Sequence, residues 1–92
     1  MIHYLKTIQP YYNDVKRRLK PFEVRKNDRD FNVGDVLILQ EYDHVNKKYT
    51  GWELPPLEVI YMLNNPEFCK EGYVILGIAD TATSMADVYK PD

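Results

Sequence analysis

Short apolar runs separated by turn-forming residues dominate this chain and predict five β-strands. Val36–Tyr42 begins with four consecutive apolar residues, and Tyr73–Ala79 is apolar almost throughout, as in strands that are covered on both faces. His3–Ile8 and Leu57–Leu63 have the β-branched and aromatic content of strands. The remaining strand, Phe22–Lys26, alternates between apolar and charged residues.

The alternation in Phe22–Lys26 predicts a half-buried strand. It places Phe22 and Val24 on the face expected to be buried. Glu23 and Arg25 then lie side by side on the polar face.

A helix is predicted between the first two strands. Pro10 suits its first turn, where the missing N–H is not needed. Tyr12, Val15 and Leu19 follow at the spacing of one apolar stripe on a helix of about ten residues. Pro21 ends the helix, because the residue before a proline is pushed out of helical geometry.

The order of these elements predicts an α+β domain. A polar hairpin loop is expected over Asp43–Gly51, and Pro55-Pro56 excludes regular pairing just before the fourth strand. Five strands with one helix after the first predict a small closed or half-closed mixed barrel, with the helix plugging one end.

The length of 92 residues allows one domain, expected over residues 1–79, with a flexible tail over residues 80–92. The first residues lack the layout of a signal peptide, and no apolar run approaches a membrane span, so a cytoplasmic location is expected. Cys69 is the only cysteine, and no His/Cys cluster has metal-site spacing. Neither an internal disulfide nor a metal or other cofactor is therefore expected.

Charge is unevenly distributed along the chain. The net charge is −2, which argues against binding of long nucleic acid by bulk electrostatics. Residues 1–30 hold eight Lys or Arg against four Asp or Glu, whereas residues 31–92 hold four against ten. A chain of this kind can present one basic face to an anion while it remains weakly acidic overall.

The stretch Lys20–Asp35 is densely charged, and its first half predicts a binding site. Strand alternation sends Glu23 and Arg25 to one side, and Lys20 lies three residues before Glu23. A lysine and an arginine that flank a carboxylate hold one another in place and keep donors for a carbonyl, a phosphate or a nucleobase edge. The alternative is a surface ion pair worth at most about 1 kcal/mol.

Other residues are candidates for ligand contact. Asn27, Asp28 and Arg29 either line a cleft or form a turn. The aromatic residues Tyr42, Tyr49, Trp52 and Tyr61 either form a stacking platform for bases or pack in the core and the hairpin, and Trp52, beside a glycine in a polar context, is the strongest candidate for ligand contact. Asp35 is expected to pin the turn before the central strand.

The run LKPFEVRKNDRDFNVGDVLILQEYD, with EGYVILGI near the C-terminus, resembles the DUF3850 group of the ASCH superfamily over residues 3–79. The most specific motifs are E-x-R-K-N-D-R-D-F-x-V-G-D and G-Y-V-I-L-G-I. The resemblance implies a small PUA-like mixed β-barrel of about five strands with one or two short helices. It also implies a cleft beside the charged motif that binds RNA or nucleotide-like ligands.

The superfamily motif G-x-K-x-x-E-x-R is matched by Lys20, Glu23 and Arg25, whereas Arg18 stands at the glycine position. Some small ASCH proteins are amidohydrolases that deacylate N4-acetylcytidine, using the motif lysine with a threonine and a later glutamate. By this resemblance Lys20 and Glu23 are the candidate catalytic residues, with Glu23 at the position of the threonine. The candidates for the later glutamate are Glu41, Glu53 and Glu58.

Three functions remain open from the sequence. The first is binding of RNA or a modified nucleotide, with no membrane partner. Its expected ligand contacts are Lys20, Glu23, Arg25, Asn27, Asp28, Arg29 and Trp52. The second is a small amidohydrolase that acts on N4-acylated cytidine or a related amide. The third is a protein-interaction module of phage or mobile-element origin that uses the tail after Ile78.

Overall fold

The computed structural model describes residues 1–81, which form one curled sheet of six strands with one short helix. The elements are β1 (Ile2–Thr7), α1 (Tyr11–Lys16), β2 (Phe22–Lys26), β3 (Val36–Asp43), β4 (Lys48–Glu53), β5 (Leu57–Leu63) and β6 (Tyr73–Asp80). Within these residues, no helix has the length and apolar character needed to cross a membrane. Most of the predicted tail, residues 82–92, lies outside the described part of the chain.

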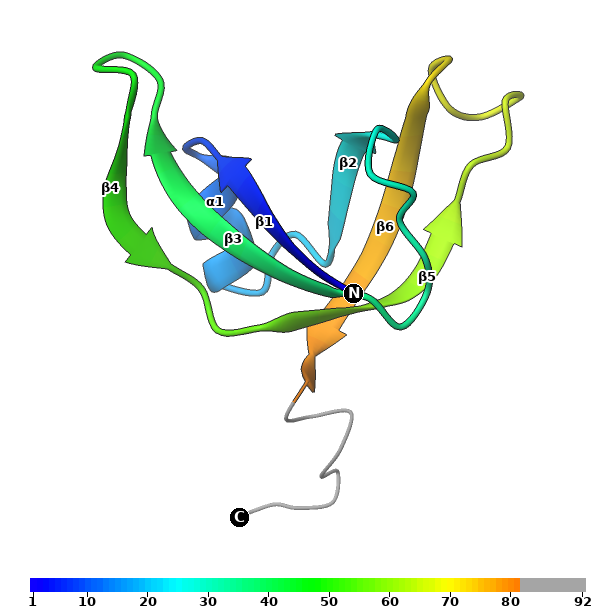
Figure 1. The fold of residues 1–92 in the computed structure, drawn as a ribbon, viewed down its shortest axis with the longest axis horizontal. Helices are drawn as coiled ribbons and strands as arrows, with labels where there is room; N and C mark the ends of the chain where they lie inside the picture. The colour runs from blue at the N-terminus through cyan, green and yellow to red at the C-terminus, as the bar shows by residue number, and fades with distance from the viewer. Residues whose placement is uncertain (82–92) are drawn as a thin grey trace.

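The sheet has the strand order β1-β3-β5-β6-β2, and β4 pairs with the remaining part of β3. β1 runs parallel to β3, and the other pairs are antiparallel. Figure 1 shows the sheet bent into a V, with β1 and β2 facing each other between its two arms. No ladder joins β1 to β2 within residues 1–81, so strand pairing does not close the sheet into a barrel.

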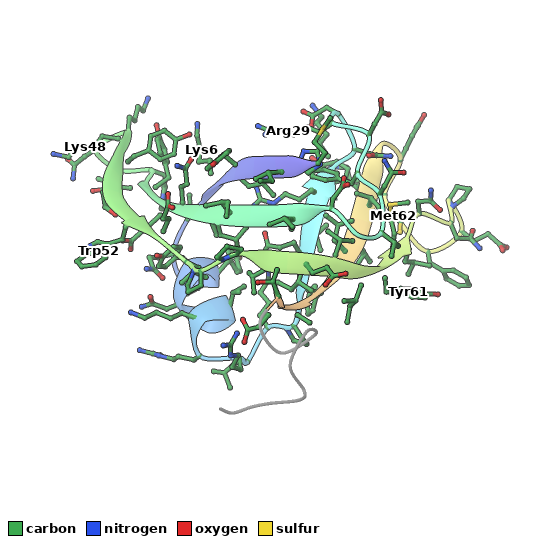
Figure 2. All side chains as sticks on the ribbon, turned by 60° about the horizontal axis from the view of Figure 1, so that its bottom comes forward. Lys6, Arg29, Lys48, Trp52, Tyr61 and Met62 are labelled. Carbon is green, nitrogen blue, oxygen red and sulfur yellow. The ribbon has the colours of Figure 1, made fainter. Side chains whose placement is uncertain are left out.

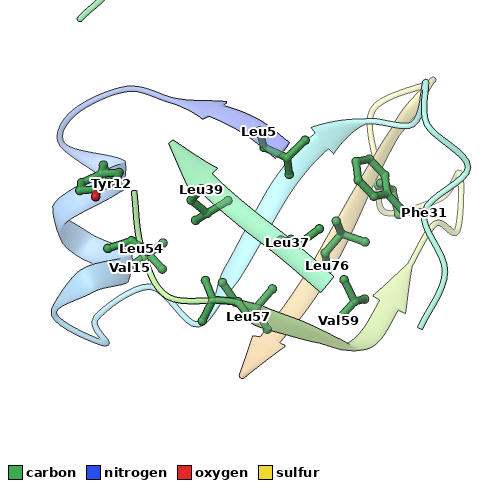
Figure 3. Packing of buried hydrophobic residues seen from close by; sticks show 12 residues of the cluster. Leu5, Tyr12, Val15, Phe31, Leu37, Leu39, Leu54, Leu57, Val59 and Leu76 are labelled. Atoms are coloured by element: carbon green, nitrogen blue, oxygen red, sulfur yellow. The ribbon is translucent and has the colours of Figure 1, made fainter. Parts of the chain in front are cut away.

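The core fills the inside of the bend (Figure 3). Leu37 and Leu39 of β3 are fully buried, which confirms the prediction of a central strand at this position. Phe31, from the loop before β3, closes one end of the core. The core residues are Leu5, Tyr12, Val15, Phe31, Leu37, Leu39, Leu54, Leu57, Val59, Val74, Leu76 and Ile78.

The helix is shorter than predicted, because the chain reverses direction right after it. Arg18 has φ 65°, in the left-handed region. Its amide donates to the carbonyl of Val15, and the Leu19 amide donates to the carbonyl of Asp14, which is a Schellman-type ending. The prediction that Leu19 continues the buried stripe was wrong, since this residue is 71% exposed.

The predicted hairpin loop contains a strand that the sequence pattern did not indicate. β4 begins at Lys48, so only residues 44–47 form the turn between β3 and β4. Asp43 stabilises that turn by accepting hydrogen bonds from the amides of Val45 and Asn46. Every residue of β4 is exposed, so this strand has no alternation of buried and exposed residues that a pattern could reveal.

Candidate functional site

β2 turns its charged face toward the inside of the sheet. Pairing with β6 places Glu23 opposite Leu76 and Arg25 opposite Val74, and both of these partners are fully buried. Glu23 is only 3% exposed. A carboxylate is therefore set into the apolar interior, where it needs charged or hydrogen-bonding partners.

The prediction for β2 was right in its alternation and wrong in its buried face. Phe22 and Val24 are 40% and 49% exposed, whereas Glu23 is buried. The apolar residues of this strand are thus available to a ligand.

Two cations compensate the buried Glu23 carboxylate. Lys20 Nζ donates to Glu23 Oε2 at 2.7 Å. Arg25 donates to Glu23 Oε1 from Nη2 at 2.7 Å and from Nε at 3.0 Å. A buried carboxylate with two cationic partners is stable only while both remain, because removal of a partner leaves a poorly compensated charge.

Arg25 also joins the two ends of the open sheet. Its Nη1 donates to the Lys6 carbonyl oxygen at 2.9 Å, and its Nη2 donates to Thr7 Oγ1 at 3.0 Å. Arg29 makes a similar bond at 2.9 Å to the carbonyl oxygen of Tyr4. Arginine side chains thus bridge β2 and its following loop to β1, two strands that no ladder joins among residues 1–81.

The chain reversal at the end of α1 places Lys20 beside Glu23. Arg18 stands at the glycine position of the charged motif, and this is the residue with the left-handed backbone, a conformation that favours glycine. The Lys20 amide donates to the Asp14 carbonyl, which holds the reversed chain against the helix. Arg18 forms an ion pair with Asp80, and Lys20 Nζ also donates to the Phe22 carbonyl at 2.9 Å.

These residues border a cleft of about 740 Å³ between β1, α1 and β2. It is lined by Lys6, Thr7, Ile8, Tyr11, Asp14, Leu19, Lys20, Phe22, Glu23, Val24 and Arg25. Five of these eleven residues are apolar or aromatic, namely Ile8, Tyr11, Leu19, Phe22 and Val24, and Lys20, Glu23 and Arg25 supply its clustered charged groups. The Lys6 ammonium does not belong to that polar cluster, because it lies 4.2 Å from the centroid of the Tyr42 ring.

All the residues of this site lie within a match to a known protein family. A sequence model described as "Domain of unknown function (DUF3850)" matches residues 2–78. The chain belongs to this family. No curated protein matches the chain. The predicted resemblance to DUF3850 is thus confirmed, and the wider ASCH placement stays a prediction.

The DUF3850 domain brings together three of the seven predicted ligand contacts, namely Lys20, Glu23 and Arg25. The other four do not line the described cleft. Arg29 is engaged with β1, and Trp52 is 74% exposed on β4. The remaining two, Asn27 and Asp28, are exposed after β2.

Sequence reasoning missed residues that reach the cleft of the DUF3850 domain from other elements. Thr7 is buried at the end of β1 and accepts a bond from Arg25. Tyr11 lies at the start of α1, and its exposed ring forms part of the wall. An exposed aromatic residue at a helix start was the available signal for Tyr11, whereas Thr7 has none in the sequence.

The candidate later glutamates lie outside the described cleft of the DUF3850 domain. Glu41 accepts from Gln9 Nε2 at 2.6 Å and from Thr50 Oγ1 at 2.8 Å, and these bonds lower the pKa of Glu41. Glu53 lies across from Gln40, and Glu58 lies across from Val36. Among residues 1–81, no group of three or more His, Cys, Asp or Glu is placed to hold a metal ion.

A second buried carboxylate, Asp35, lies apart from the residues that line the cleft. It accepts from His3 Nε2 at 2.8 Å, from the Asn32 amide at 3.0 Å and from the terminal ammonium of Met1 at 3.2 Å. Burial alone would raise the pKa of Asp35, but these bonds outweigh burial and lower the pKa below its ordinary value. The prediction that Asp35 pins the turn is confirmed.

Proposed function

We propose that this DUF3850 domain is a binding module whose cleft takes one nucleobase of an RNA or of a modified nucleotide. The observation that carries the proposal is the oriented Glu23 carboxylate beside an aromatic-walled cleft. Lys20 and Arg25 hold that carboxylate in a fixed position, and Tyr11 and Phe22 border the cleft next to it.

The free hydrogen-bonding groups of the site favour a base edge over a phosphate. Arg25 already uses four of its five N–H donors within the described residues, so it cannot offer the two-pronged contact that phosphate prefers. Lys20 uses two of three donors. Glu23 accepts three bonds and retains room for one more. Glu23 therefore suits an exocyclic amine, and Lys20 suits a neighbouring carbonyl or ring nitrogen.

The size and walls of the cleft support the same ligand class. A volume of about 740 Å³ is within the range of small-molecule sites. The rings of Tyr11 and Phe22 provide apolar surface for a planar base. Because the net charge is −2, we expect modest affinity for a short single-stranded ligand and not for a long duplex.

We further propose that the fold is a PUA-like barrel of the ASCH superfamily, interrupted between β1 and β2. The V-shaped sheet supports this proposal, since its two end strands face each other and are bridged by Arg25. In this arrangement the interruption is the ligand cleft itself.

A calorimetric titration with nucleosides and short single-stranded RNAs at low salt tests the binding proposal. We expect binding by the native protein and a loss of at least about tenfold in affinity for Lys20→Ala, because the donor that orients the base is removed. Arg17→Ala is the matched control, since Arg17 is an exposed cation at the end of α1 that does not line the cleft. Absence of binding by the native protein contradicts the proposal.

The amidohydrolase alternative shares the same cleft, because the 2.7 Å contact between Lys20 and Glu23 joins its two candidate catalytic residues. Incubation with N4-acylcytidines separates the two functions. The binding module leaves these compounds unchanged. Formation of cytidine by the native protein, abolished in Lys20→Ala, would replace the binding proposal with the enzyme.

A further inference from the structure

The outer face of β1, β3 and β4 gathers aromatic and basic side chains. Because Leu5 points into the core, its neighbours Tyr4 and Lys6 project to the opposite side of β1. Tyr42 of β3 pairs with Tyr49 of β4 on that same side. Tyr4, Lys6, Tyr42 and Tyr49 are called the tyrosine–lysine face below.

Direct contacts hold most of this face together. Lys6 Nζ lies 4.2 Å from the centroid of the Tyr42 ring, a cation–π contact between neighbouring strands. The Tyr42 and Tyr49 rings meet edge to face, with centroids 5.1 Å apart and an interplanar angle of 76°. Tyr4 and Tyr49 are 55% and 52% exposed, so about half of each side chain remains open to a partner.

Cations surround the face in a chain whose net charge is negative. Figure 2 shows Lys48, Lys6 and Arg29 along one side of the molecule. The nearby acid Asp43 is engaged by hydrogen bonds from its own hairpin turn, and these bonds lower the pKa of Asp43. Glu53 lies across from Gln40, the β3 partner of Lys6, and its Oε1 accepts a hydrogen bond from Gln40 Nε2 at 3.5 Å. The face therefore presents aromatic rings beside positive charge, which complements a negatively charged partner with planar groups.

The face also adjoins the proposed base-binding cleft. β1 forms the boundary between them, because the Lys6 carbonyl accepts from Arg25 in the cleft while the Lys6 side chain lies on the outer face. A chain of nucleotides that leaves the cleft over β1 therefore reaches the rings of the tyrosine–lysine face directly.

We propose that the tyrosine–lysine face binds the nucleotides that flank the base held in the cleft of a single-stranded RNA. This inference rests on the proposed function of the cleft. Aromatic rings stack with any base, and Lys6, Arg29 and Lys48 neutralise phosphates. A folded protein partner is the less favoured occupant, since charge and aromatic rings occur together here without an apolar groove.

The experiment compares a mononucleoside with single-stranded RNAs of increasing length. We expect the longer oligonucleotides to bind about 100-fold more tightly than the mononucleoside. Tyr4→Ala and Tyr49→Ala each remove about tenfold of that gain and leave mononucleoside affinity unchanged. Lys6→Gln reduces the slope of log affinity against log salt by about 0.7. Tyr61→Ala is the matched control, because this tyrosine is 65% exposed and lies on β5 at the other end of the molecule (Figure 2).

The possible outcomes distinguish a failure of the proposal for the tyrosine–lysine face from a failure of the proposal for the cleft. If oligonucleotides bind no more tightly than the mononucleoside, or if Tyr4→Ala and Tyr49→Ala behave like Tyr61→Ala, the face is not an RNA surface and the cleft proposal stands. If the tyrosine variants weaken oligonucleotide binding while Lys20→Ala does not and mononucleosides do not bind, the face stands and the cleft proposal fails. No binding to any RNA overturns both.

Discussion

Glu23 and Asp35 are both buried carboxylates, but they differ in the groups that compensate them. Asp35 is bound by an imidazole, a backbone amide and the terminal ammonium. Glu23 is bound by the ends of two long cationic side chains, from Lys20 and Arg25. The first carboxylate fastens parts of the backbone to one another, and the second lies beside a cleft.

Asp35 lies in a network of contacts that fixes the loop before β3. Its carbonyl accepts from the Val59 amide, and the Gly34 amide donates to the Val59 carbonyl, so the loop before β3 is tied to β5 on both sides. His3 also packs its ring on Phe31, with centroids 4.7 Å apart. These contacts hold the loop, and Asp35 is not among the residues that line the cleft.

The comparison shows that burial of a charge does not by itself identify a binding site. What distinguishes Glu23 is that its partners line a cleft and keep unused N–H donors. We therefore expect substitutions at both carboxylates to lower stability, but only the substitution at Glu23 to weaken ligand binding.

The largest expected effect comes from Glu23→Gln, which replaces the carboxylate with an amide of the same shape. The free energy of unfolding falls by about 3 kcal/mol, because Lys20 and Arg25 lose their counter-charge in a buried setting. Affinity for a nucleoside falls about 100-fold, since the acceptor for the amine is lost. Urea denaturation and calorimetric titration measure the two quantities.

Asp35→Asn is the matched control for this experiment. It lowers the free energy of unfolding by about 2 kcal/mol, because three donated bonds lose a charged acceptor. Nucleoside affinity stays within about twofold of the native value. Equal losses of affinity in the two variants would mean that the distinction between the carboxylates is wrong.

Arg25 and Arg29 both donate hydrogen bonds to β1, but of the two only Arg25 lines the cleft. A comparison of Arg25→Ala with Arg29→Ala tests whether the contact at the cleft contributes more to stability. Arg25→Ala lowers the free energy of unfolding by about 2 kcal/mol, because Glu23 loses one of its two cations and the link to β1 disappears. Arg29 is exposed, so its removal changes stability by about 0.5 kcal/mol. Thermal and urea denaturation measure both, and equal values for the two arginines would show that Arg25 has no special role.

A smaller effect is expected at Thr7, which contacts Glu23 only through Arg25. Thr7→Val keeps the shape of the side chain but removes the acceptor of the Arg25 Nη2 bond. The free energy of unfolding falls by about 1 kcal/mol, while Thr7→Ser, which keeps the hydroxyl, loses less. The affinity for a nucleoside, measured by titration, is also expected to fall more in Thr7→Val than in Thr7→Ser. A Thr7→Val protein as stable as Thr7→Ser would contradict a role for the hydroxyl.

The sequence allowed accurate prediction of the strands that turn-forming residues delimit. Phe22–Lys26 and Leu57–Leu63 were predicted with their observed bounds, because prolines precede both strands. The end of α1 and the strand β4 were not predicted. The first depends on a left-handed backbone at a residue other than glycine, and the second on an edge strand without a buried face.

The candidate site was predictable only in part, because its members come from distant segments. Strand alternation correctly placed Glu23 and Arg25 together. Their inward orientation follows from pairing with the fully buried Leu76 and Val74, which the sequence of β2 alone does not reveal. Thr7 joins them from β1, through a bridge that exists only in the folded sheet.

The smallest expected effect is a change in the pH dependence of stability, and it concerns Asp35. The folded state lowers the pKa of Asp35, so its contribution is complete above its unfolded pKa of about 4 and disappears as pH falls through the lower folded value. Between these two pKa values the unfolded chain binds more protons, and the free energy of unfolding therefore rises with pH. Urea denaturation across the acidic range is expected to give a shallower slope for Asp35→Asn than for the native protein. An unchanged slope would show that His3, Asn32 and the Met1 ammonium do not stabilise the ionised carboxylate.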